Sequence, residues 1–126
     1  MSEINFQGIF DKLQEALTDG WKKVIFFAAY TEGSYSMKFY TDLGDGVYVD
    51  CFKSAKLNKM QLIKIFMEID KDLSVSRKES NPEWTVLTMI VDEEGNMSTK
   101  FDYEDVSDHM VDYERKWKEK YLQQQE

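Results

Sequence analysis

Residues 21–30, WKKVIFFAAY, restrict the possible folds more than any other stretch of the chain. From Val24 to Tyr30 every residue is apolar or aromatic, and two of them, Val24 and Ile25, are β-branched. A run of this length and composition is typical of a strand with both faces buried, because a strand with one wet face alternates between apolar and polar residues. The run therefore predicts a central strand of a sheet.

The segments around this run predict an antiparallel sheet of about five strands. Residues 35–40, YSMKFY, alternate cleanly, and DLGDG then leads into a third strand at 47–52. Residues 84–91 and 97–103 are predicted to be two further strands that flank DEEGN. This linker is a strong hairpin signal, because Gly95 and Asn96 both tolerate positive φ.

Helical spacing predicts two helices before the second strand pair. One covers residues 6–17, where Phe6, Phe10, Leu13 and Leu17 fall on one face. The other begins after Asn58, which forms a capping pair with Gln61, and continues through about residue 73. Residues 74–83, which hold the single proline of the chain, are predicted to form a loop.

Ser107 is expected to cap a last helix, with Asp108 favourably placed at its N-terminus. The element order is then α-β-β-β-α-β-β-α. Segregated strands of this kind indicate an antiparallel sheet with packed helices. The fold class is therefore α+β, and we expect residues 1–126 to form a single domain, since this length fits one core.

Charge and cysteine content exclude several classes of protein. The formal net charge of −8 argues against direct binding to nucleic acid or to an anionic membrane surface, and it favours a basic protein partner. Cys51 is the single cysteine, so an internal disulfide, a thiolate zinc cluster and a CxxC pair are excluded, and we expect it to be a core residue of the third strand. The N-terminus lacks the basic flank of a signal peptide, and no apolar run approaches the roughly 20 residues of a membrane span. We therefore expect a cytoplasmic protein.

The sequence contains none of the common catalytic or cofactor-binding motifs. Phosphate-binding loops, GxGxxG, GxSxG and HExxH are all missing. His109 is the single histidine, so multi-histidine metal sites are excluded, and we expect it to be a surface residue. We therefore predict no catalytic residues, no metal and no cofactor, and we do not expect an enzyme.

A dense run of carboxylates lies between Asp92 and Glu114, where nine acids face a single base, Lys100. Strand alternation sends Asp102 and Glu104 away from the apolar face, and the start of the last helix follows directly. We expect these groups to form one exposed patch where strand, turn and helix meet. The candidate partner-binding residues are Asp102, Glu104, Asp105, Asp108, Asp112 and Tyr113.

Three interpretations of this patch remain open. The acids could be an ordinary solvated edge with favourable charges at a helix start, which requires no partner. They could bind calcium or magnesium, although the D-x-[DN]-x-[DN]-G loop is missing. They could also form a surface that steers a basic protein into contact, which would make association fast and salt-sensitive.

The order of elements and several motifs resemble the YezG-like immunity proteins of bacterial polymorphic toxin systems. The motifs are Trp21-Lys-Lys-Val24, Tyr40-Thr-Asp42, Glu83-Trp84-Thr85, Gly95, FDYED at 101–105, and Tyr113 with WKEKYL at 117–122. Together they span most of the chain. The terminal pair, F-x-Y-x-D followed by W-K-x-K-Y-L, is the most specific of these signals. The family often continues past the KYL motif, whereas this sequence ends in QQQE.

The resemblance implies an antitoxin that binds and silences a cognate toxin, commonly a secreted nuclease, by stoichiometric inhibition without catalysis. An acidic patch suits such a role, since the phosphate-binding site of a nuclease is typically basic. We expect a monomer or a weak dimer. The alternative is a small acidic secretion chaperone, a class that is similar in size, charge and element order and that binds an effector protein, usually as a stable dimer.

Overall fold

The computed structural model describes residues 4–54 and 57–122 and confirms the α+β fold, with one five-stranded antiparallel sheet. The strand order is β3-β2-β1-β4-β5, so β1 is central, as its continuous apolar run predicts. The elements are α1 (Phe6–Gln14), β1 (Lys23–Thr31), β2 (Ser34–Asp42), β3 (Tyr48–Asp50), α2 (Cys51–Ser54), α3 (Lys59–Glu79), β4 (Val86–Asp92), β5 (Met97–Asp102) and α4 (Met110–Tyr121).

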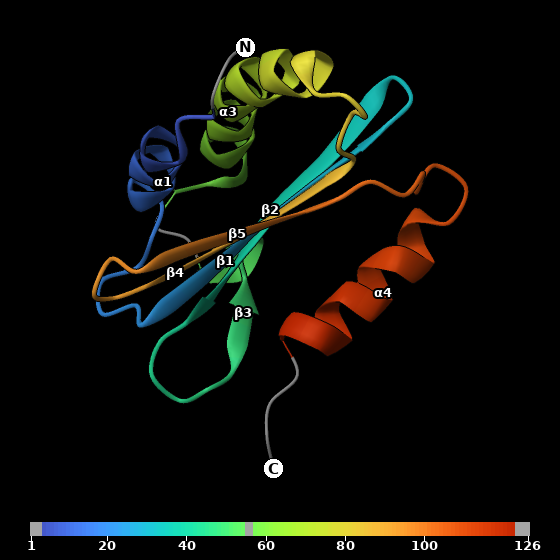
Figure 1. Ribbon diagram of the computed structural model, residues 1–126. Helices are drawn as coiled ribbons and strands as arrows, with labels where there is room; N and C mark the ends of the chain where they lie inside the picture. Colours follow the sequence, from blue (N-terminus) through green and yellow to red (C-terminus); the bar gives the residue numbers. More distant parts are fainter. Residues whose placement is uncertain (1–3, 55–56, 123–126) are drawn as a thin grey trace.

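Both faces of β1 are buried because helices cover both sides of the sheet (Figure 1). On one face, Phe26 and Ala28 belong to the larger core, which α1 and α3 complete. On the other face, Ile25 and Phe27 belong to a smaller core with Trp117 of α4. The sheet is therefore the middle of three layers.

The start of α3 follows the predicted cap. The Asn58 side chain accepts a hydrogen bond from the Gln61 backbone N–H at 2.9 Å, and the Gln61 side chain accepts one from the Asn58 N–H at 3.0 Å. This reciprocal pair satisfies two backbone donors that have no partner within the helix. It places Leu62 and Phe66 over the sheet, where both are buried.

A buried hydrogen bond fixes α4 against the second face of the sheet. The Trp117 indole N–H donates to the Thr88 hydroxyl at 2.9 Å, and both side chains are buried. The Trp117 ring also packs on Phe27, with 4.8 Å between ring centroids. Beside it, Lys38 of β2 forms an ion pair with Glu114 of α4 at 2.9 Å.

The predicted third strand at 47–52 is only partly correct. β3 ends at Asp50, and α2 begins at Cys51. The Asp50 carboxylate accepts the backbone N–H of Phe52 at 2.8 Å, a local hydrogen bond that favours a turn over continued pairing at the sheet edge. Cys51 is fully buried, so the prediction of a core cysteine is confirmed but its placement in a strand is wrong.

Two helix boundaries also differ from the predictions. The loop predicted at 74–83 is wrong over its first six residues, because α3 continues to Glu79, where Arg77 forms an ion pair with Glu83 at 3.3 Å. The first helix ends at Gln14 instead of residue 17, because its last turn closes through bonds to the residue three positions earlier. Leu17 is nevertheless buried.

The start of the last helix is displaced from the predicted cap. The helix begins at Met110, and its N-cap residue is His109, which makes no side-chain capping bond. Ser107 lies in the preceding turn, where its backbone N–H donates to the Asp105 carboxylate at 3.0 Å. Val106 is fully buried beneath this turn. The buried Val106 and the Asp105 bond thus hold the chain in a turn over the residues where the helix was expected to start.

Candidate functional site

The carboxylates between residues 92 and 114 divide into two groups in space. β5 runs from Met97 to Asp102, so the β4–β5 turn and the connection to α4 lie at its opposite ends (Figure 1). Of the turn acids, Glu93 forms an ion pair with Lys22 at 3.1 Å, and Asp92 accepts the Asn96 N–H at 2.9 Å. The acids at the β4–β5 turn are therefore part of the hairpin, and the candidate surface consists of residues 102–112.

Asp102 faces α4 and is only partly exposed. In the sheet it is paired with Val86, whose side chain belongs to the core beneath α4. The Asp102 carboxylate accepts a hydrogen bond from the Tyr113 hydroxyl. Burial and this carboxylate raise the pKa of the Tyr113 phenol, so the hydroxyl keeps its proton. The prediction that Asp102 points into open solvent is therefore wrong, because α4 covers the face that alternation alone left uncovered.

We define residues 104–108 as the acidic loop. Its first residue is anchored through the backbone, where the Glu104 carbonyl accepts a hydrogen bond from the Thr85 hydroxyl at 2.6 Å. The Glu104 carboxylate lies 3.2 Å from Nε2 of His109. The hydrogen bond from the Ser107 N–H lowers the pKa of Asp105, so this group stays ionised well into the acid range. Hydrogen bonds at Glu104 and Asp105 thus fix the acidic loop, while its carboxylates stay exposed.

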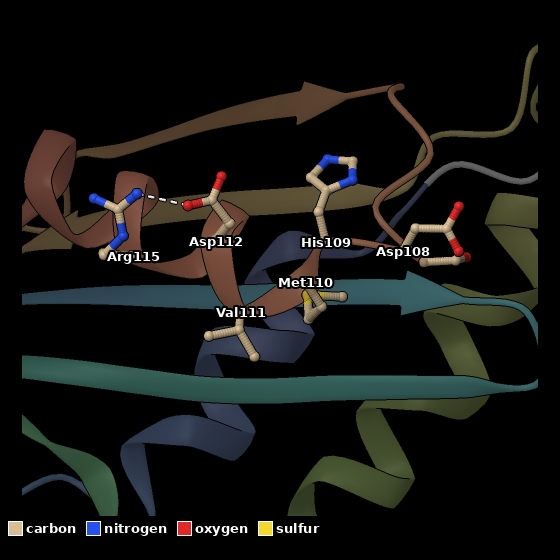
Figure 2. Close-up of a pocket in the computed structure, with 7 residues that line it drawn as sticks. Asp108, His109, Met110, Val111, Asp112 and Arg115 are labelled. Atoms are coloured by element: carbon tan, nitrogen blue, oxygen red, sulfur yellow. Dashed lines mark hydrogen bonds and ion pairs between the residues drawn. The ribbon is translucent and has the colours of Figure 1, made fainter.

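Asp108 and Asp112 line an open depression of about 550 Å³ at the start of α4 (Figure 2). Asp112 forms ion pairs with Arg115 at 2.6 Å and with Lys116 at 3.4 Å, and the Arg115 bond lowers the pKa of the Asp112 carboxyl. Asp108 has no such cation beside it within residues 4–54 and 57–122. The uncompensated charge therefore lies in the acidic loop, while that of Asp112 is balanced on the helix.

Two further residues belong to this surface, and sequence reasoning missed the first of them. The Val111 side chain is 87% exposed on the first turn of α4 and is one of the residues that line the depression. His109 also lines this depression, and its Nε2 lies 3.2 Å from the Glu104 carboxylate. An apolar residue on the polar side of an amphipathic helix was the available signal for Val111. A mixture of exposed acids with an exposed apolar residue is compatible with a protein-binding surface.

The described part of the chain gives little support for a metal site, a nucleophile pair or a membrane span. No group of three or more His, Cys, Asp or Glu residues there is arranged to hold a metal ion. Cys51 belongs to the core beneath α1 and α3, whereas His109 begins the helix on the opposite face, so the two do not form a nucleophile pair. None of the described helices is long and apolar enough to cross a membrane.

The family model of the YezG-like immunity proteins matches residues 2–125. The chain belongs to this family. No curated protein shows a significant sequence match to it.

In this YezG-like protein, the motifs that carry the resemblance are largely parts of the framework. Trp84 and Trp117 are buried in the two cores, and the Asp42 carboxylate accepts the N–H groups of Gly44 and Gly46 in the loop after β2. The F-x-Y-x-D motif supplies Asp102, which bonds to Tyr113, and Asp105, which closes the acidic loop. The motifs thus build the support beneath the exposed acids.

Proposed function

We propose that this protein neutralises a cognate bacterial toxin by binding it stoichiometrically through the acidic loop and the first turn of α4. Membership of an immunity protein family supports the antitoxin role. The observation that carries the choice of surface is the exposed acids Glu104, Asp105 and Asp108, which lack a lysine or arginine ion pair among the described residues.

A nuclease is the toxin class that suits this surface best. A nuclease binds phosphates in a basic site, and clustered carboxylates on a rigid loop would occupy that site in place of nucleic acid. The exposed Val111 would lose its contact with water in the complex, which adds a favourable apolar contribution. Long-range attraction would accelerate association, and added salt would slow it.

The mechanism requires no catalysis, metal or cofactor from this chain. In our proposal the whole chain acts as one immunity domain in the cytoplasm, as a monomer or weak dimer, and does not bind nucleic acid itself. Inhibition then depends on complementarity of shape and charge with one toxin.

The test is affinity capture of the tagged protein from its native host, followed by a nuclease assay on the basic domain that is retained. We expect that domain to degrade nucleic acid when it is assayed by itself, and to lose this nuclease activity when an equimolar amount of this protein is added. A partner whose activity survives binding would contradict the proposal and favour the secretion chaperone. A captured toxin that is inhibited but is no nuclease would retain the immunity role and overturn the nuclease assignment.

Charge reversal then tests the surface itself. Glu104→Lys/Asp108→Lys should weaken inhibition at least tenfold without loss of folded structure, because both side chains are exposed. The matched control is Glu15→Lys/Glu94→Lys, which makes the same charge change at two exposed sites away from the acidic loop. Equal inhibition by both double variants would place the interface elsewhere. Asp102 is left unchanged, because its bond to Tyr113 would confound the result.

A further inference from the structure

A second exposed surface lies on the opposite side of the sheet from α4. On α3, the side chains of Met60, Ile63 and Met67 are exposed, with 75% of Met60 and 54% of Met67 accessible. Residues three or four apart are neighbours on a helix, so these three form a continuous apolar strip. Phe52 of α2, which is 44% exposed, lies next to α3, where its ring packs against the buried Phe66 with 6.5 Å between centroids.

The charge around this strip is opposite to that of the whole chain. Between residues 51 and 67 the described part of the chain includes three lysines and no carboxylate, although the protein carries a net charge of −8. Lys53, Lys59 and Lys64 are exposed and make no ion pair within the described residues. The strip therefore has lysines beside its first two turns, and the carboxylates of Glu68 and Asp70 begin only after Met67.

We propose that this apolar strip docks a short amphipathic helix with acidic flanks from a partner protein. A row of apolar side chains along one helix flank is the natural complement of another helix with apolar residues at i, i+3, i+4 and i+7. The lysines beside the strip select acidic residues next to that row. This surface is independent of the acidic loop, which lies beside α4 on the other face of the sheet (Figure 1).

A second copy of this chain fits the strip less well. A two-fold symmetric contact places the same patch on both subunits, so the lysines beside the two strips would meet and repel. A standard interface also takes about 800 Å² and some 20 to 30 residues from each partner, far more than the four exposed apolar side chains offer. A short segment is the occupant that this small area and this charge favour.

Binding of designed peptides tests the proposal on the intact protein. The probe is a synthetic helical peptide with leucine at i, i+3, i+4 and i+7 and glutamate elsewhere. The control peptide carries lysine in place of every glutamate. We expect the glutamate peptide to bind at least tenfold more tightly by calorimetry, to weaken with added salt, and to shift the amide resonances of residues 59–68. Equal affinity for both peptides, or shifts confined to other residues, would overturn the proposal.

Matched variants distinguish binding at the strip from non-specific hydrophobic binding. Ile63→Glu/Met67→Glu should weaken binding of the glutamate peptide at least tenfold, whereas Leu43→Glu, an exposed apolar position in the β2–β3 loop, should leave it unchanged. Lys59→Glu/Lys64→Glu should reverse the preference toward the lysine peptide. Dependence of the α3 resonances on protein concentration alone would contradict the proposal, because it would identify a second copy as the occupant.

Discussion

The Tyr113 hydroxyl donates a hydrogen bond to the Asp102 carboxylate, which joins the last helix to the end of the last strand. Both residues are partly buried, and the acidic loop lies between them in the chain. This bond closes the loop at its base, so the exposed acids at Glu104 and Asp108 sit on a connection that is fixed at both ends. A recognition loop held in this way loses less conformational entropy on binding than a free one.

Removal of the Tyr113 hydroxyl should show how much this hydrogen bond contributes to the free energy of unfolding. Tyr113→Phe leaves a partly buried carboxylate without its donor, and a hydrogen bond to a charged group is worth roughly 1.5–3 kcal/mol. We expect the free energy of unfolding, measured with urea, to fall by about that amount. Tyr103→Phe is the control, because the Tyr103 side chain is 53% exposed, and such a change should cost less than about 0.5 kcal/mol. Equal losses in the two variants would show that the Asp102 bond contributes no net stability.

The hydrophobic pattern and the helix-capping signals of the sequence are sufficient to predict the centre of the sheet and the start of α3. The apolar run at β1 predicted the centre of the sheet, and Asn58 with Gln61 predicted the start of α3, because both signals depend on neighbours in the sequence. Alternation on β5 distinguished two faces, but it could not show that α4 covers the second one. The position of Asp102 was therefore mistaken, since its surroundings depend on a residue eleven positions away.

The acidic surface shows the same limit of sequence reasoning. Nine carboxylates that are close in the chain end at opposite ends of β5, because a strand of six residues separates them. Glu93 pairs with Lys22, and Asp112 pairs with Arg115, so proximity in sequence overstated the free negative charge. Most of the exposed carboxylates without a lysine or arginine ion pair in the described residues lie in the acidic loop, and Glu94 at the β4–β5 turn is a further one.

The hydrogen bond between Trp117 and Thr88 should hold α4 on the sheet. Thr88→Val keeps the shape of the side chain but leaves the buried indole N–H of Trp117 without an acceptor. An unsatisfied buried donor costs about 1–3 kcal/mol. We expect the free energy of unfolding to fall by that amount, whereas Thr88→Ser, which keeps the hydroxyl, should recover much of it. If the serine variant is no more stable than the valine variant, lost packing and not the hydrogen bond explains the effect.

The reactivity of Cys51 offers a test of its burial in the core. Burial raises the pKa of the thiol to about 12, so almost none of it is ionised at pH 8, and the thiolate is the reactive form. Iodoacetamide should therefore modify the native protein on the order of a hundredfold more slowly than the urea-unfolded chain. The reaction of the native protein should accelerate as the pH rises from 8 toward 11, since the thiolate fraction grows. Rapid modification at pH 8 under native conditions would contradict a buried Cys51.

The cap at Asn58 links the stability of α3 to the proposed docking strip, because Met60 lies in the first turn of that helix. Asn58→Ala removes the side-chain acceptor of the Gln61 N–H and should cost about 1 kcal/mol. Asn58→Ser keeps an acceptor at the cap and should stay close to the wild type in urea unfolding. Amide hydrogen exchange gives a local readout, in which the Gln61 N–H should exchange faster in the alanine variant than in the serine variant. Equal exchange rates would mean that tertiary packing of Leu62 and Phe66, and not the cap, orders the first turn and presents Met60 at the surface.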